Sequence, residues 1–189
     1  MTSRRPITKM LRQLTPTGSI SKRTSYAGTV TLSLAILLSA CTAITGYQKR
    51  PQDPDDRRYK VEAVRFAGGT GVTLAGELTM PQAGGPFKAV VLISGSGPQD
   101  RNEALAGHKP FLVLSDHLTR AGFAVLRYDD RGTYGSEGNF KTATSQDFAT
   151  DVDAAIDYLK TRTDINTSKI GLIGHSEGGL IAPMVSSKR

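Results

Sequence analysis

Three short runs of apolar residues constrain the fold of this chain most strongly. They lie at Lys88–Ser94, Phe123–Asp129 and Lys169–Gly174, and none of them alternates between apolar and polar positions. Such runs are typical of strands that are buried on both faces of a parallel sheet. Segments with helical spacing of apolar residues separate them, at 110–122 and 145–162. Strands that alternate with helices predict an α/β fold with a mostly parallel sheet and right-handed crossovers.

An antiparallel hairpin is predicted ahead of the first apolar run. Lys60–Phe66 and Val72–Met80 are strand candidates, and a glycine-rich turn separates them. For the second helix we expect Thr144 to be the N-cap with the carboxylate of Asp147 three residues on, and the acidic residues to lie on its solvent face. The sheet is therefore predicted to be mixed, with an antiparallel N-terminal hairpin.

The positive charge of the chain is concentrated at its N-terminus. The net charge is +7, but residues 1–40 hold six basic residues and no acidic ones. The remaining residues carry 18 basic and 17 acidic side chains and are nearly neutral. The high isoelectric point therefore does not indicate a nucleic-acid partner, and we expect none.

The same N-terminal region has the features of a secretion signal. A basic stretch ends at Arg23, and Tyr26–Cys41 contains no charged residue but is shorter than the roughly 20 residues that span a membrane. Residues 38–41, Leu-Ser-Ala-Cys, resemble a bacterial lipoprotein box, which implies that Cys41 is lipidated and becomes the first mature residue. An uncleaved anchor or a buried cysteine is the alternative.

These features predict a division of the chain into three parts. Residues 1–40 form a signal peptide, residues 42–58 are a polar, proline-containing linker, and residues 59–189 are the folded part. We expect the protein to be exported to the cell envelope, on its periplasmic or outer face, with a lipid anchor at Cys41 as its contact with the membrane.

The sequence Gly-His-Ser-Glu-Gly at 174–178 fits the G-x-S-x-G motif. A predicted strand ends at Gly174 and a helix-compatible segment follows, which is the strand–turn–helix that this motif requires. We therefore expect Ser176 to be a nucleophile held on a strained turn above a helix N-terminus. The alternative is an exposed serine on an ordinary turn.

Two further loops follow the other apolar runs. Residues 94–103 are rich in glycine and serine, and we expect the backbone N–H of Ser96 to form an oxyanion hole with that of Glu177; Gly97 is the alternative donor. Residues 128–138 begin with Asp129 and Asp130, and Arg131 follows directly. Charge pairing that shapes this loop is favoured over catalysis.

Together these loops resemble the α/β-hydrolase fold, and more narrowly the bacterial secreted esterases of its serine aminopeptidase-like group. The resemblance covers about residues 60–187 and rests on the segments SGSGPQDRNE, YDDRGTYGSEG and GHSEGGLIAP. It implies an acyl hydrolase with Ser176 as nucleophile, an acyl-enzyme intermediate, and neither a cofactor nor a metal.

The acid and the base of the catalytic triad have no counterpart in the sequence. In this fold they follow the serine along the chain, whereas residues 177–189 contain no His and no Asp. None of His108, His117 and His175 occupies a matching position. The chain is therefore predicted to be the N-terminal part of a hydrolase domain that is truncated at its C-terminus, with little or no activity alone.

The leading functional hypothesis is hydrolysis of a small-molecule carboxylic ester. A serine peptidase or a thioesterase would use the same machinery, so both remain open. A non-catalytic, lipid-anchored binding protein is the alternative from a different class.

Overall fold

The computed structural model describes residues 50–189. The predicted signal peptide at 1–40, the lipidation of Cys41 and residues 42–49 of the predicted linker lie outside the described residues. Within residues 50–189, none of the helices is both long and apolar enough to cross a membrane.

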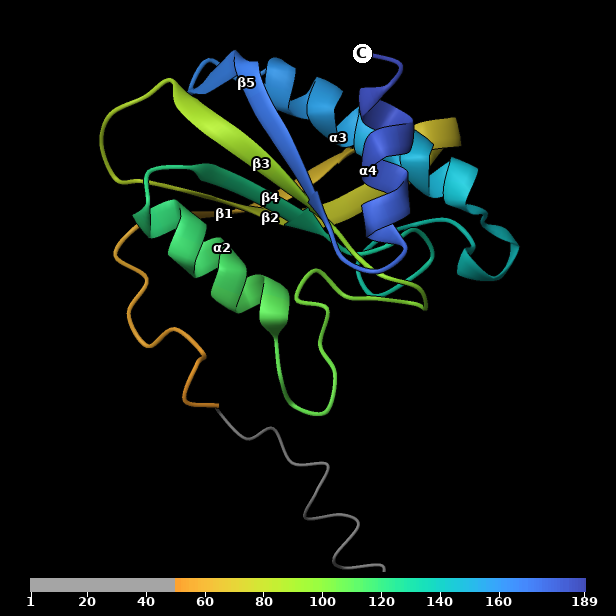
Figure 1. Ribbon diagram of the computed structural model, residues 1–189, viewed down its shortest axis with the longest axis horizontal. Coiled ribbons are helices and arrows are strands. Elements are labelled where there is room, and N and C mark those ends of the chain that lie inside the picture. Colours follow the sequence, from red (N-terminus) through yellow and green to blue (C-terminus); the bar gives the residue numbers. More distant parts are fainter. Residues whose placement is uncertain (1–49) are drawn as a thin grey trace, which may run out of the picture. The chain divides into compact units, whose positions relative to one another are not determined.

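The core of the fold is a five-stranded mixed sheet with the strand order β1-β2-β4-β3-β5 (Figure 1). The strands are β1 (Lys60–Ala67), β2 (Thr73–Met80), β3 (Phe87–Ile93), β4 (Ala124–Tyr128) and β5 (Ile165–Gly174). β1 pairs with β2 and β2 with β4 in antiparallel fashion, whereas β3 is parallel to both β4 and β5. The predicted hairpin and the predicted parallel region are both confirmed.

Helices cover the sheet on both faces (Figure 1). One face carries α2 (Pro110–Arg120), and the other carries α3 (Ser145–Lys160) and α4 (Gly178–Ser186). Two short 3₁₀ turns, η1 (Gly69–Gly71) and η2 (Phe140–Thr142), lie in the connections. The sheet is thus the middle layer of three.

The alternation of side chains along β3 explains why its apolar run is continuous. Val90 and Leu92 pack in the cluster beneath α2, whereas Val91 and Ile93 pack in the larger cluster beneath α3 and α4. Burial on both faces removes the need for polar positions, as the sequence pattern predicted.

The predicted N-cap of α3 is confirmed. The Thr144 hydroxyl accepts a hydrogen bond from the Asp147 backbone N–H, and the Asp147 carboxylate accepts one from the Thr144 N–H at 2.9 Å. This reciprocal pair satisfies two backbone donors that the first turn of a helix leaves without partners.

Two expectations about burial were wrong. The run Lys169–Gly174 in β5 was expected to be buried on both faces, but it is half-buried or exposed, because among the described residues β5 pairs only with β3 and forms an edge of the sheet. The acidic residues of α3 were all expected on its solvent face, but Asp151 is buried because it pairs with Arg131.

Candidate active site

The turn after β5 has the geometry of a nucleophile elbow. Ser176 adopts a φ of 51°, a conformation that costs free energy for a residue with a side chain. The two flanking glycines permit this turn. A Cβ on Gly174 would lie 2.0 Å from the Gly178 carbonyl oxygen, and a Cβ on Gly178 would lie 2.3 Å from the Ile93 carbonyl oxygen. The motif therefore requires both glycines for steric reasons.

The elbow and the loop after β3 lie side by side because their strands are neighbours in register. Ile93 and Gly174 are paired residues at the ends of β3 and β5, and the His175 N–H donates to the Ile93 carbonyl oxygen at 3.0 Å. A Cβ on Gly95 would lie 3.0 Å from the Cβ of Ser176. The glycine-rich loop thus passes directly beside the serine, as expected at the carboxyl ends of parallel strands.

The structure brings together the side chains of the two residues whose N–H groups are the predicted oxyanion donors. The Ser96 hydroxyl donates to a carboxylate oxygen of Glu177 at 2.9 Å, and the Ser145 hydroxyl donates to the other oxygen at 2.6 Å. Within residues 50–189, no group accepts a hydrogen bond from the backbone N–H of Ser96 or from that of Glu177. Their role in holding an oxyanion stays a prediction.

The cavities around the loop do not decide between Ser96 and Gly97, the alternative donor. Ser96 lines the same cleft as Ser176, whereas Gly97 lines a small neighbouring cavity together with Glu177, and Gly95 lines both. The choice between Ser96 and Gly97 therefore stays a prediction.

We call the space in front of Ser176 the nucleophile cleft. Its volume is about 260 Å³. Its lining residues are Gly95, Ser96, Gln99, Glu103, Leu105, Pro110, His175 and Ser176. Among the described residues, no side chain is hydrogen-bonded to the Ser176 hydroxyl, so the proton acceptor that a serine nucleophile needs is not in place.

Glu103 is a site residue that the sequence did not point to. Its carboxylate is almost fully buried, and a single oxygen accepts hydrogen bonds from the Gly95 N–H and from His175 Nδ1, both at 2.7 Å. Glu103 therefore connects the glycine-rich loop to the residue before the nucleophile. The Gly95 N–H therefore already has an acceptor.

Asp129 and Asp130 tie the loop after β4 to the glycine-rich loop. Asp129 binds the Arg101 guanidinium at 2.7 Å, and although burial raises its pKa, this ion pair and the hydrogen bonds from Arg101 and Gly135 lower the pKa below its usual value. Asp130 accepts hydrogen bonds from the Ser94 hydroxyl at 2.5 Å and from the Gln99 N–H at 3.0 Å. Burial outweighs these two hydrogen bonds and raises the pKa of Asp130 to about 7.

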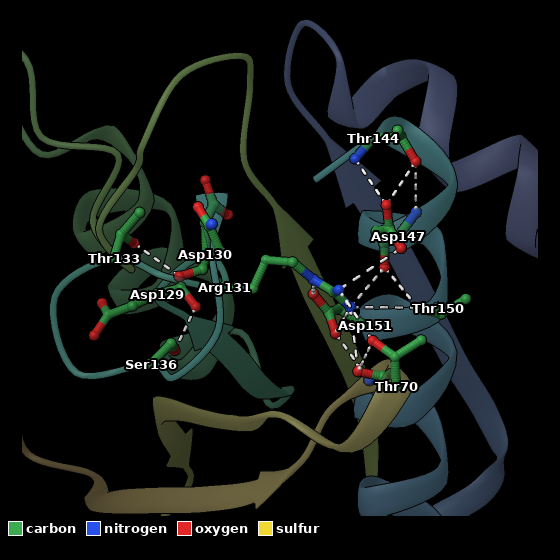
Figure 2. Close-up of polar contacts among 12 residues, drawn as sticks. Thr70, Asp129, Asp130, Arg131, Thr133, Ser136, Thr144, Asp147, Thr150 and Asp151 are labelled. Carbon is green, nitrogen blue, oxygen red and sulfur yellow. Dashed lines mark hydrogen bonds and ion pairs between the residues drawn. The ribbon is translucent and has the colours of Figure 1, made fainter. Parts of the chain in front are cut away.

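Arg131 forms a buried ion pair with another part of the fold. Its guanidinium points away from Asp129 and Asp130 and meets the Asp151 carboxylate of α3 in two contacts of 2.7 Å (Figure 2). Charge pairing that shapes this loop is thus present, but Arg131 does not pair with its sequence neighbours. The pairing joins the end of β4 to α3 and to η1, since Asp151 also accepts from the Gly69 N–H at 2.9 Å.

Comparisons with known proteins agree with this geometry. Residues 69–189 match the sequence model of the X-Pro dipeptidyl-peptidase (S15) family. Esterase EstD from Thermotoga maritima is 35% identical over 116 residues, which are 61% of this chain and 27% of EstD. The chain spans less than half the length of the curated relatives that it matches.

Solved structures share the fold. The crystal structure of the hypothetical protein PA2218 from Pseudomonas aeruginosa has a TM-score of 0.60 at 24% identity. The match covers 75% of this chain and 44% of the PA2218 chain. The alpha/beta hydrolase GrgF from Penicillium sp. sh18 has a TM-score of 0.59 at 22% identity, with coverage of 69% and 42%. The resemblance to α/β-hydrolases is therefore confirmed, and the chain belongs to the X-Pro dipeptidyl-peptidase (S15) family.

Proposed function

We propose that this chain carries the nucleophile and the oxyanion hole of a serine hydrolase that acts on carboxylic esters. The observation that carries the proposal is the elbow itself: a non-glycine residue at positive φ, facing a cleft, beside two backbone N–H groups without partners among the described residues. Such donors stabilise negative charge that develops on a carbonyl oxygen during acyl transfer.

In the proposed reaction the Ser176 hydroxyl attacks the ester carbonyl. The N–H groups of Ser96 and Glu177 hold the oxyanion of the tetrahedral intermediate. The alcohol then leaves with a proton, and water hydrolyses the acyl-enzyme. The acyl group thus passes from the alcohol to Ser176 and then to water, with no cofactor required for the electron balance.

The base that accepts the serine proton is proposed to lie outside residues 50–189. His175 is bound to Glu103 through Nδ1, and His108 lines a neighbouring pocket instead of the nucleophile cleft. We therefore propose that the 189-residue chain alone turns over esters slowly or not at all.

A peptidase is the second candidate because the matching family is named for X-Pro dipeptidyl-peptidases. An esterase is supported by the name of EstD and by two carboxylates, Glu103 in the nucleophile cleft and Glu177 next to Ser176 in the sequence, which already have partners. Glu103 is bound to Gly95 and His175, and Glu177 to Ser96 and Ser145, so neither is set aside for the ammonium group of a peptide substrate.

The test compares p-nitrophenyl esters, X-Pro p-nitroanilides and a thioester as substrates. The protein should include any coding sequence that follows Arg189, and Ser176→Ala is the control. We expect turnover of esters that Ser176→Ala abolishes. Cleavage of the anilide in preference to the esters would support the peptidase instead, and no Ser176-dependent turnover of any substrate would support a non-catalytic binding protein.

We also propose that the protein is exported and held at the cell envelope by a lipid on Cys41. The support is the sequence at 26–41 alone. Cells grown with radiolabelled palmitate should yield labelled protein in the membrane fraction, and Cys41→Ala should abolish the label. A label that persists in Cys41→Ala would contradict the proposal.

A further inference from the structure

A larger pocket adjoins the nucleophile cleft. We call it the outer pocket; its volume is about 710 Å³, within the range of pockets that bind small molecules. It shares Leu105 and Pro110 with the nucleophile cleft, so the two spaces lie next to each other. Its lining residues are Arg50, Gln52, Asp53, Leu105, Ala106, His108, Lys109, Pro110, Val113, Leu114 and His117.

The wall of the outer pocket is fixed by polar contacts. The turn that begins at Arg50 is held to the loop 104–109 because the Arg50 guanidinium donates to the Ala106 carbonyl oxygen at 2.8 Å. Lys109 Nζ lies 3.6 Å from a carboxylate oxygen of Asp53. The Lys109 ammonium is thus paired with Asp53, and the Arg50 guanidinium is bound to a backbone carbonyl.

The surface that remains for a ligand is apolar. Val113 and Leu114 are half-buried on α2, and Leu105 is 77% exposed at the junction with the nucleophile cleft. Exposure of the leucine side chain to water is unfavourable, and a hydrocarbon chain that covers it removes this cost.

We propose that the outer pocket binds the hydrocarbon chain of the ester and makes medium-chain esters the substrate class of this site. The inference rests on the proposed function, since it takes Ser176 as the reacting group. An ester whose carbonyl lies at Ser176 extends its chain past Leu105 and Pro110 and over Val113. The alkyl chain is selected by burial alone, because each pair of buried methylene groups is worth about tenfold in affinity.

A binding experiment tests the pocket without catalysis. Decan-2-one and butan-2-one, which cannot be hydrolysed, are titrated calorimetrically into the Ser176→Ala chain. We expect decan-2-one to bind at least tenfold more tightly than butan-2-one. Val113→Trp, which fills the pocket, should weaken decan-2-one at least tenfold, and so should Leu105→Asp, whose exposed position keeps the fold intact. Val61→Trp, on β1, is the matched control and should change nothing.

Equal affinity for the two ketones, or no effect of either pocket variant, would overturn the proposal. So would a chain that binds no decan-2-one and sediments as a dimer that Leu105→Asp dissociates, because the pocket would then be an interface between copies.

A kinetic experiment links the pocket to the reaction. In the protein with any coding sequence that follows Arg189 included, the ratio of kcat/KM for p-nitrophenyl decanoate to that for p-nitrophenyl acetate should fall at least tenfold in Val113→Trp and stay unchanged in Val61→Trp. If Ser176→Ala still hydrolyses both esters, the proposed function fails. The ketone titration would still show whether the outer pocket binds a hydrocarbon chain. If turnover depends on Ser176 but the ratio is unchanged in Val113→Trp, the proposal for the outer pocket is overturned and the proposed function stands.

Discussion

Removal of the Asp151 carboxylate should strongly destabilise the fold. The side chains of Arg131 and Asp151 are 6% and 1% exposed, and Asp151→Ala would leave a buried guanidinium and the Gly69 N–H without their acceptor. Breaking a buried ion pair from one side costs about 3–5 kcal/mol. The lower half of this range is expected, because Arg131 keeps Asp147 at 3.7 Å and two backbone carbonyls. The corresponding fall in Tm is about 6–16 °C.

Urea denaturation followed by circular dichroism measures this change in the free energy of unfolding. Asp153→Ala is the matched control, because Asp153 lies on the same helix and pairs with Arg189 in a contact where both side chains are about one-third exposed. That substitution should cost less than about 1 kcal/mol. The double variant Arg131→Leu/Asp151→Leu should recover part of the loss, since it leaves no buried charge. A cost for Asp151→Ala as small as that for Asp153→Ala would refute the reasoning.

Three further predictions concern the residues that shape the site. In the protein with any coding sequence that follows Arg189 included, Glu103→Ala should lower the kcat for ester hydrolysis at least tenfold with less change in KM, because Gly95 and His175 lose their acceptor. Glu103→Gln should restore most of the rate through its amide oxygen, and equal rates for the two variants would contradict this. Between about pH 4 and about pH 7, Asp130 is protonated in the folded state and ionised in the unfolded state. The free energy of unfolding should therefore decline with rising pH by up to ~1.4 kcal/mol per pH unit, compared with that of Asp130→Asn. Parallel curves for the two proteins would count against the raised pKa. Gly178→Ala should destabilise by ~1–3 kcal/mol in thermal unfolding because its Cβ would meet the Ile93 carbonyl, whereas Gly171→Ala, with 3.9 Å to its nearest neighbour, should be close to neutral.

Local patterns in the sequence were sufficient to predict the layers of the fold. The continuous apolar runs located β3 and β4 because a strand buried on both faces needs no polar positions, and Thr144 and Asp147 located the start of α3 because a capping box is contained within four residues. The elbow at Ser176 was recognisable for the same reason: its glycines and its flanking strand and helix are close in sequence.

Features that depend on distant residues could not be predicted. The Glu103–His175 contact joins residues 72 positions apart, and a lone carboxylate in a loop carries no sign of its partner. Arg131 follows two aspartates, yet its acceptor is Asp151, twenty positions away, because the fold turns its side chain toward α3. The exposure of β5 was missed since an apolar pattern does not tell whether a strand lies inside a sheet or at its edge.

The central claim is that Ser176 is a nucleophile. The most direct test is labelling with a fluorophosphonate probe, followed by peptide mass spectrometry, in the protein with any coding sequence that follows Arg189 included. We predict that the probe modifies the peptide that contains Ser176, that Ser176→Ala abolishes the label, and that prior incubation with an ester slows it. A folded protein that stays unlabelled, or that is labelled equally in Ser176→Ala, would contradict the account.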